Sequence, residues 1–414
     1  MELLGAIAYI LLGRWFVARR AAAAFALLNV AALYIFFFFG KDVRFQTLFN
    51  LLFVVYVALV SFQYVTLLVW AKGKDRSQRR GVWLAFFTPL AILAVIRYAP
   101  LGEIVRPFPS IRVVLERHPE FTLGSVLVSY SYLAFRTSRL VLEVRNGIVV
   151  LPSYWEYLGF AIFAPTLSVG PINLYSRHAK AFVAGDRPGI PVGQSLLRVL
   201  KGAVKFRFLG PILNELTYSG LLLDGHPHPW VDLPVAIVAY YLFLYCNFSG
   251  FCDIAIGAAG LMGIDVAENF LNPFAARNMK DFWNRWHITL SQYMRDLVFS
   301  PLSRTLVGCM GAERVNEAVA ITIIVVFLLI GIWHGTAWNY AVFGLIQGVG
   351  VVADLYISTA LKKWLGKDGF AAYNRNPWIL AAARTLTFIF FSCSLFFFAN
   401  DGKAMQRIFA ALRW

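Results

Sequence analysis

The sequence predicts an all-α polytopic membrane protein with about ten to eleven transmembrane helices and additional amphipathic helices at the membrane interface. Of its 414 residues, 59% are hydrophobic and only 14% are charged, and the mean hydropathy is +0.65. An ordinary soluble domain is about 45–50% apolar and about 25% charged. Apolar runs that reach the roughly 20 residues of a helical span recur from one end of the chain to the other.

The expected spans follow from the positions of these runs. Clear runs occupy 21–40, 46–71, 82–97, 121–142, 153–170, 233–263, 317–335, 337–357 and 378–399. Shorter or more mixed runs occupy 2–18 and 195–223. No repeat and no long soluble insert separates them, so residues 1–414 are expected to form a single membrane domain.

Basic residues predict the orientation in the membrane. Arg19 and Arg20 follow the first apolar run, and five basic residues crowd 72–80 after the third. Two spans separate these clusters, so both are expected on one side, which the positive-inside rule makes cytoplasmic. The first run has its arginines behind it and no small-residue cleavage site, so it is expected to be retained as a span whose amino terminus faces outward.

Three segments are not expected to be regular spans. Prolines interrupt any helix in 98–120, which predicts a loop or an interfacial piece. Glycine and proline make 183–193 a loop. Segment 195–217 is basic and amphipathic, which fits either a surface helix or a tilted span with snorkelling cations. Its cations are Arg198, Lys201, Lys205 and Arg207.

The net charge of +16 lies in short loops between apolar spans, so membrane topology and anionic lipid explain it better than nucleic acid does. The four cysteines lie in apolar surroundings without metal-type spacing, which predicts small buried side chains, no disulfide framework and no metal site. They are Cys246, Cys252, Cys309 and Cys393.

The segment FWNRWHITLSQYMRD, 282–296, is unusually polar for this chain. If it is one helix, Trp283, Trp286 and His287 share an apolar face and the charged residues share the other. The sequence therefore predicts an amphipathic helix at the membrane boundary that turns His287 inward. An aromatic-belt anchor with a hydrogen-bonded histidine is an equally good interpretation.

His334 stands in a stretch without Asp, Glu, Lys or Arg from 318 to 353. At about 1.5 Å per residue these residues exceed one bilayer crossing, so the helix must break, most plausibly at Gly331, Gly335 or Asn339. Ionisable side chains inside a membrane are rare and by default functional. Close helix approach at Gly331-x-x-x-Gly335 explains the glycines without chemistry, but not the histidine. The other histidines fall in loops or at ends and are expected at the surface: His118, His178, His226 and His228.

The second half of the chain resembles the membrane-bound O-acyltransferase (MBOAT) family. The resemblance lies in the bacterial branch that contains the D-alanyl transfer protein DltB and the alginate O-acetylase AlgI. It rests on NFSGFCDIAIGAAGLMGI (247–264), ENFLNPF (268–274), NMKDFWNRWHITLSQYMRD (278–296) and GIWHGTAWNYAVFGLIQG (331–348), with weaker support from 123–136 and 164–175. It implies a catalytic core over 121–360, less well matched spans over 1–120, and a terminal loop and span over 361–414.

Within the branch the signals divide. NMKDFWNRWH resembles the DltB side, whereas Asp253 resembles the AlgI side. Asn247, Phe251 and Cys252 depart from the residues usual in the family. The resemblance therefore leaves the acyl group open between D-alanyl and acetyl.

The resemblance implies an O-acyltransferase in the bacterial cytoplasmic (inner) membrane. A cytoplasmic thioester, carried on acyl-carrier phosphopantetheine or on acyl-CoA, would donate the acyl group to a hydroxyl of an envelope polymer or polysaccharide. No tightly bound cofactor is expected. The expected partners are membrane lipid, an acyl carrier protein or acyl-CoA, and an extracytoplasmic acceptor polymer or acyl-handling protein.

Histidine suits this chemistry because its ordinary pKa, near 6.5, lets it act as a base at neutral pH. We expect His334 to take the proton of the acceptor hydroxyl, and His287 to orient the acceptor or to stabilise the oxyanion. Asp253 is expected to support the site or to form a structural ion pair. Lining or scaffolding roles are expected for Asn269, Trp283, Arg285, Trp286, Arg295, Trp333 and Asn339.

Two other classes of protein remain open on the residues alone. A polytopic transporter or proton-coupled channel also uses intramembrane His and Asp, although it has no need of the tryptophan-histidine segment. A noncatalytic scaffold in an envelope assembly would need the histidines only for folding.

Overall fold

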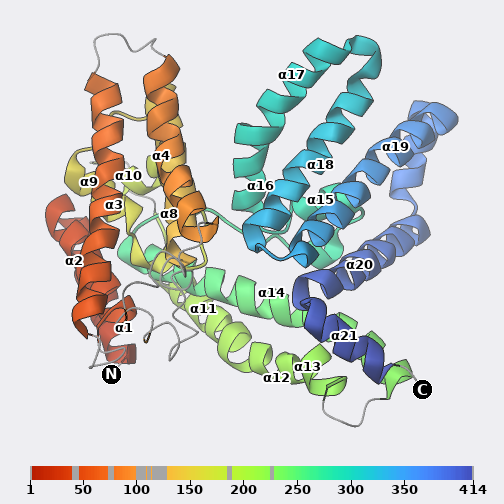
Figure 1. The fold of residues 1–414 in the computed structure, drawn as a ribbon, viewed down its shortest axis with the longest axis horizontal. Helices are drawn as coiled ribbons and strands as arrows, with labels where there is room; N and C mark the ends of the chain where they lie inside the picture. Colours follow the sequence, from red (N-terminus) through yellow and green to blue (C-terminus); the bar gives the residue numbers. More distant parts are fainter. Residues whose placement is uncertain are drawn as a thin grey trace. The chain divides into compact units, whose positions relative to one another are not determined.

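The computed structural model describes residues 2–39, 46–72, 79–98, 128–183, 189–223 and 228–412, with 109 and 113. Most of the predicted loop 98–120, part of the loop 183–193, and Lys74, Arg76, His118 and His226 lie outside these residues. The described part is helical (Figure 1). It forms two compact units, Met1–Gly202 with Phe251–Ala267, and Ala203–Gly250 with Glu268–Trp414.

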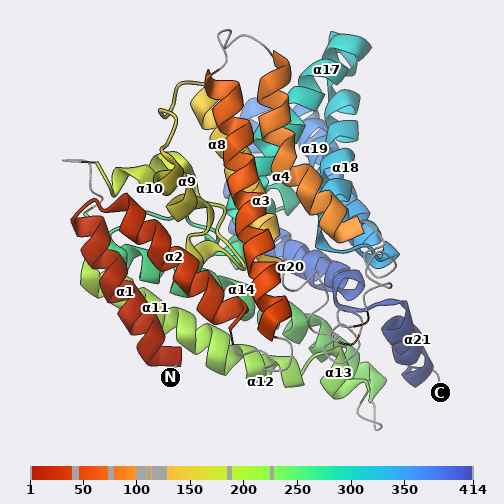
Figure 2. The same cartoon turned by 60° about the vertical axis from the view of Figure 1, so that its left-hand side comes forward.

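The first unit packs its helices around an apolar core that contains Phe25, Phe163 and Met262. Within that core Asn29 accepts a hydrogen bond from the Tyr9 hydroxyl at 2.7 Å. Figure 2 shows α2 crossing α9 in this unit. Its helices are α1 (Glu2–Ala18), α2 (Ala22–Phe37), α3 (Gln46–Lys72), α4 (Arg79–Tyr98), α8 (Val128–Arg145), α9 (Tyr154–Ala161), η3 (Ala164–Thr166), α10 (Tyr175–Lys180), α11 (Val192–Ala203) and the final part of α14 (Pro229–Met262).

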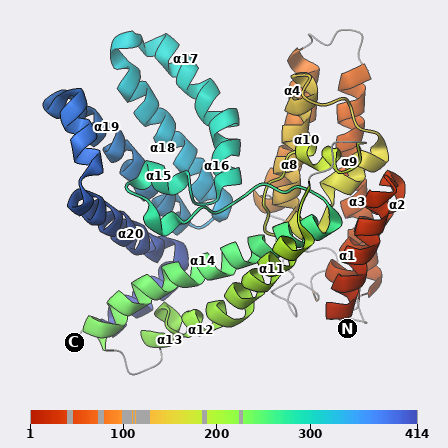
Figure 3. The same ribbon diagram turned by 180° about the vertical axis from the view of Figure 1, so that it is seen from behind.

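The second unit is dominated by the antiparallel pair α18 and α19, against which α15, α17 and α20 pack (Figure 3). Its elements are η4 (Val204–Leu209), α12 (Gly210–Glu215), α13 (Tyr218–Leu221), the first part of α14, η5 (Pro273–Ala275), α15 (Met279–Trp283), α16 (Ile288–Met294), η6 (Arg295–Phe299), α17 (Ser300–Met310), η7 (Ala312–Arg314), α18 (Val315–His334), α19 (Trp338–Arg375), α20 (Pro377–Ala399) and α21 (Gly402–Ala411).

Among the described residues, six helices are long and apolar enough to cross a membrane. They are Phe49–Ala71, Gly81–Tyr98, Trp230–Met262, Ala312–His334, Trp338–Arg375 and Pro377–Ala399. Two shorter apolar helices cover Leu3–Ala18 and Ala22–Phe37. The expected count of ten to eleven spans is therefore not confirmed, whereas the helical membrane architecture is.

One predicted span, 153–170, is wrong, and segment 195–223 is not one regular helix. The helix that begins at Tyr154 ends at Ala161, because the ring of Pro165 would clash with the carbonyl of Ala161 in a continued helix. Segment 195–223 divides into α11, the π-helix η4, α12 and α13. Its cations Arg198 and Lys205 bind Asp253 and Ser249 of α14, so this segment is anchored along a membrane helix.

The cysteine prediction is half right. Cys246 and Cys252 are buried free thiols on α14, as expected. Cys309 and Cys393 are exposed, so their burial was wrongly predicted. Cys393 lies on α20, one of the helices long and apolar enough to cross a membrane, and Cys309 lies on the shorter helix α17.

Candidate active site

The break predicted in the uncharged stretch 318–353 is confirmed. Helix α18 ends at His334, Gly335 caps it with extended backbone, and α19 begins at Trp338. The two helices approach closely, since a Cβ on Gly331 would lie 3.2 Å from the Cα of Gly344. His334 is consequently placed at the turn of a tight helical hairpin, at the negative end of the α18 dipole.

The single amphipathic helix expected over 282–296 is not present. Helix α15 ends at Trp283 and α16 begins at Ile288. His287 lies between them in the left-handed region, with φ 45° and ψ 51°. The helical face drawn through Trp283, Trp286 and His287 is therefore wrong, although all three side chains are buried as that face required.

The physical reason for the break is a second segment that takes the backbone hydrogen bonds. The N–H of Ile288 donates to the carbonyl of Asn269 at 3.0 Å, and the N–H of Leu271 donates to the carbonyl of Arg285 at 2.9 Å. Residues 269–271 thus pair with 285–288, and these bonds replace the turns that a continuous helix would make.

Asn269 is fully buried and fixes His287 through its side chain. Its Oδ1 accepts from the N–H and the hydroxyl of Thr289 at 3.2 and 2.9 Å, and it lies 3.2 Å from Nδ1 of His287. Because the Thr289 N–H can only donate, this atom of Asn269 is the oxygen. Nδ1 of His287 therefore carries the proton, which places the ring's lone pair on Nε2.

The structure brings the two histidines together. The His287 ring lies 4.8 Å from the ring of Phe248 and 6.1 Å from that of Trp333, which precedes His334. Burial lowers the pKa of His287 to about 3, and the positive charge that His334 can carry contributes in the same direction. His287 is accordingly a neutral imidazole at ordinary pH.

Aromatic residues surround His334, which is half-buried. Its ring lies 4.6 Å from that of Trp333 and 4.9 Å from that of Phe398. Asn339, predicted as lining, ties the start of α19 to α20 by donating to the carbonyl of Phe397 at 2.9 Å. Its Oδ1 is buried and has no hydrogen-bond partner among the described residues.

The sequence did not predict a series of hydrogen bonds between buried side chains. The indole N–H of Trp283 donates to Oε1 of Gln347 at 3.2 Å, and Nε2 of Gln347 donates to the Ser394 hydroxyl at 2.6 Å. Gln347 is fully buried on α19. The sequence feature that could have predicted it is the amide of Gln347 inside an uncharged stretch, because a buried amide needs hydrogen-bond partners.

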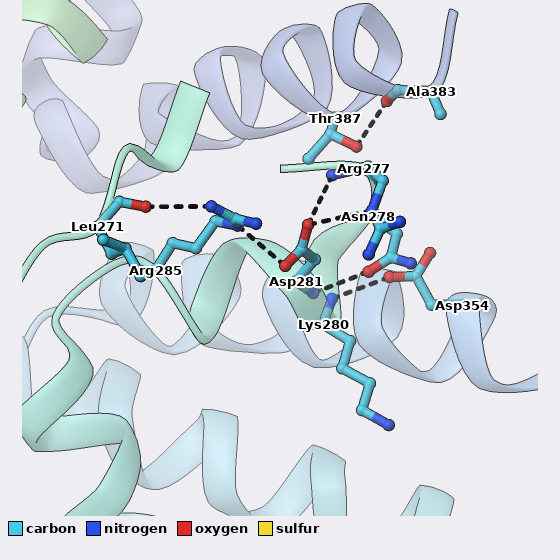
Figure 4. A network of polar contacts seen from close by, with 9 residues as sticks. All are labelled: Leu271, Arg277, Asn278, Lys280, Asp281, Arg285, Asp354, Ala383 and Thr387. Atoms are coloured by element: carbon cyan, nitrogen blue, oxygen red, sulfur yellow. Dashed lines mark hydrogen bonds and ion pairs between the residues drawn. The ribbon is translucent and has the colours of Figure 1, made fainter. Parts of the chain in front are cut away.

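The charged side chains of residues 277–285 form a local network of hydrogen bonds and ion pairs (Figure 4). The carboxylate of Asp281 accepts from the guanidinium of Arg285 at 2.9 Å and from the N–H of Arg277 at 3.2 Å. The N–H of Lys280 donates to Asp354 of α19 at 3.0 Å, which fixes α15 against that helix. Arg285 is therefore a positioning residue here, and Arg295 likewise binds Asn284 at 2.7 Å.

A pocket of about 360 Å³ lies in the first unit, and a larger one of about 600 Å³ lies in the second. The apolar part of the larger pocket's wall includes Trp283, Phe327 and Ile330. Three cations and one acid line it as well: Lys280, Arg295, Lys362 and Asp354. Ile330 precedes His334 by four residues, so the two side chains project from the same face of α18.

Asp253 forms an ion pair with Arg198 at 3.0 Å within the first unit, which is one of its two predicted roles. Among the described residues no group of three His, Cys, Asp or Glu side chains is arranged to hold a metal ion.

Comparison with known proteins identifies the family. A model described as "MBOAT, membrane-bound O-acyltransferase family" matches residues 35–399. A teichoic acid D-alanyltransferase of Streptococcus thermophilus is 30% identical over 348 residues, which cover 79% of this chain and 78% of that protein.

Two further relatives carry other names. A peptidoglycan O-acetyltransferase of Helicobacter pylori is 35% identical over 60% of this chain and 45% of its own length. A probable alginate O-acetylase AlgI of Pseudomonas putida is 27% identical over 70% of this chain and 58% of its own length. With a family model that spans most of its length and all-helical architecture in its described part, the chain belongs to the membrane-bound O-acyltransferases, multi-pass membrane enzymes that transfer acyl groups to hydroxyls.

Proposed function

We propose that this enzyme transfers a D-alanyl or acetyl group from a cytoplasmic thioester to a hydroxyl of a cell-envelope polymer, with His334 as the general base. The observation that carries the proposal is the pairing of two histidines from separate motifs, with His287 fixed by Asn269 beside Trp333 and His334. The names of the relatives supply the choice of acyl group and acceptor.

The reaction follows from the protonation states. The acceptor hydroxyl attacks the thioester carbonyl while His334 takes its proton, and a tetrahedral intermediate forms. The C–S bond then breaks, the ester remains on the acceptor, and the proton on His334 passes to the departing thiolate. A positioned base of this kind typically contributes about 10²–10⁴-fold in rate.

His287 has a distinct part in this scheme. Its Nδ1 proton is directed at Asn269, so Nε2 presents a lone pair, which can accept a hydrogen bond from a hydroxyl but cannot donate one to an oxyanion. Of the two roles predicted for His287, this geometry supports orientation of the acceptor. Burial keeps the imidazole neutral, so it can accept a hydrogen bond from a neighbouring hydroxyl of the acceptor and leave the single proton of the attacking hydroxyl to His334.

The 600 Å³ pocket is the proposed approach of the donor. Lys362, Lys363, Lys367 and Arg375 lie toward the end of α19, whereas the turn at 335–337 has no charge. By the positive-inside rule the lysine end of α19 faces the cytoplasm, here the cytoplasmic side of a bacterial inner membrane. Lys280, Arg295 and Lys362 would hold the phosphates of an acyl carrier or of acyl-CoA, and the apolar wall would receive the pantetheine arm.

The test is mass spectrometry of ester-linked groups on envelope polymers. Cells would carry the native protein, His334→Ala, His228→Ala or no protein. His228 is exposed and lies before α14, so its variant is the matched control. We expect one ester-linked group to disappear without the protein and with His334→Ala, and to persist with His228→Ala. An ester profile that is the same in all four strains refutes the proposal, and a profile lost only without the protein refutes the role of His334.

A further inference from the structure

A second cavity, of about 360 Å³, lies in the first unit and is lined by residues from the start of α2, from α9 and from α10. Its volume falls in the range of about 300–1,000 Å³ that is typical of small-molecule sites. Most of its wall is apolar and includes Phe25, Leu151, Trp155 and Phe182. No part of the proposed acyl transfer uses it.

His178 of α10 lines this cavity and contradicts its prediction as a surface residue. It is only 2% exposed and lies among four phenylalanine rings. Their centroids are 5.4–6.0 Å from that of the imidazole and belong to Phe25, Phe160, Phe163 and Phe182. The sequence misled because Arg177 and Lys180 make α10 look like a surface loop.

Nδ1 of His178 is buried without a hydrogen-bond partner in the part of the chain that the structure describes. Burial lowers its pKa to about 3, and the charge of Arg136 lowers it too, so the ring is neutral. A neutral imidazole donates one hydrogen bond or accepts one, depending on the tautomer. A buried polar atom without a partner is rare in an apolar wall, so this part of the first unit is unusual.

The mouth of the cavity has the character of a membrane boundary. Val150 is 88% exposed and Trp155 is 40% exposed, which suits the interfacial belt where indole rings gather. Two exposed cations flank wall residues in the chain: Arg20 precedes Ala22 by two positions, and Lys180 follows Ala179. Neither forms an ion pair with another described residue. The acid at the mouth, Glu156, is engaged at the start of α9, where it accepts from Ser153 at 2.7 and 2.8 Å.

From this arrangement we propose that the cavity binds one molecule of an anionic glycerophospholipid. An acyl chain occupies the apolar space, and the headgroup phosphate lies against Arg20 and Lys180. The orientation agrees with the sequence, because Arg20 belongs to a basic cluster that the positive-inside rule places at the cytoplasmic leaflet, where anionic lipid is concentrated.

The test is photolabelling of the full-length protein in membranes with phosphatidylglycerol that carries a diazirine in one acyl chain, followed by peptide mapping. Phosphatidylcholine with the same chain is the comparison probe. We expect the label to concentrate on the peptides that contain 148–159 and 175–183, and phosphatidylglycerol to label them more strongly. Labelling spread evenly over the exposed faces of the spanning helices, or equal labelling by both lipids, would overturn the proposal.

Matched variants separate loss of the site from loss of the fold. Ala22→Phe fills the cavity, whereas Ala23→Phe adds the same ring at an exposed neighbour on α2. Arg20→Asn with Lys180→Gln removes the two charges, and asparagine tolerates the positive φ of 55° at position 20. The exposed Arg314→Gln is the charge control.

We expect Ala22→Phe to abolish the localised label and Ala23→Phe to retain it. The double charge variant should lose about thirty-fold in phosphatidylglycerol labelling, because each cation contributes about 1 kcal/mol, and Arg314→Gln should leave the labelling unchanged. Undiminished labelling of Ala22→Phe protein whose thermal unfolding matches the native protein contradicts the site. O-acyl transfer is measured on the same preparations, so failure of the lipid site and failure of the proposed function are read independently.

Discussion

Asn269 holds His287 from a position eighteen residues earlier in the chain. One oxygen of Asn269 accepts from the backbone and hydroxyl of Thr289 and lies 3.2 Å from Nδ1 of His287. The backbone carbonyl of Asn269 accepts from Ile288 at 3.0 Å. Two loops that would otherwise be independent thereby form one rigid support for the imidazole.

Replacing Asn269 with alanine is expected to reduce both stability and activity. Three hydrogen bonds are lost at once, and the buried N–H of Thr289 is left without its acceptor, a loss of about 1–3 kcal/mol. The measurements are thermal unfolding and the rate of acyl transfer in reconstituted vesicles. Asn146→Ala is the control, because Asn146 is exposed after the end of α8 and has no part in the proposed site. Equal behaviour of the two variants would argue against the support role.

The pH dependence of the rate should follow the protonation of His334 and not that of His287. Burial lowers the pKa of His287 to about 3, so that ring stays neutral throughout the working range. The acid limb of the kcat/KM profile should therefore persist, with the same midpoint, in a slower His287→Gln enzyme. In the residual activity of His334→Gln the limb should be absent. A limb that vanishes with His287→Gln would reverse the two assignments.

The backbone at position 287 gives a separate test. His287 adopts φ 45°, a conformation that asparagine tolerates and alanine does not favour. His287→Asn should unfold near the temperature of the native protein, whereas His287→Ala should lose about 1–2 kcal/mol more through strain. Both should be slow in acyl transfer, because neither supplies Nε2. A fast His287→Asn enzyme would show that the residue serves only the backbone.

Stability should fall on acidification through the two buried histidines. For each, the folded pKa of about 3 lies below the unfolded value near 6.5. Between these values the unfolded state binds a proton that the folded state does not, so the free energy of unfolding decreases by up to about 1.4 kcal/mol per pH unit and per histidine. Above pH 6.5 there is no such contribution. His178→Gln should flatten the dependence between pH 6 and about 4, and the exposed His228→Gln should leave it unchanged.

The glycine contact between α18 and α19 should be intolerant of any side chain. A Cβ on Gly344 would lie 3.2 Å from the Cα of Gly331, with the carbonyl of Phe327 closer still. Gly344→Ala should therefore force the helices apart and lower the unfolding temperature. Gly308→Ala is matched to it, since that glycine is also helical but has open space around its Cβ position, and should gain about 1 kcal/mol from helix propensity. A neutral Gly344→Ala would contradict the close packing.

The sequence predicted the features that depend on hydropathy and local breakers. The turn after His334 was predictable because 36 uncharged residues cannot cross one bilayer as a single helix and glycines mark the break. The left-handed His287 was not predictable, because the pairing of 269–271 with 285–288 is a tertiary contact that overrides a good amphipathic pattern. The burial of His178 was hidden for the same reason, since its four phenylalanine neighbours come from α2, α9 and the segments beside η3 and α10.

Helix α14 belongs to both compact units, with Gly250 in one and Phe251 in the other. The chain passes from the first unit to the second at Ala203, returns at Phe251 and leaves again at Glu268. No single cut divides such a polypeptide into two self-sufficient pieces, because a fragment ending at Gly202 lacks the stretch of α14 that completes its core. Neither a fragment that ends at Gly202 nor one that begins at Ala203 is therefore expected to fold alone, so the protein has to be expressed as one polypeptide.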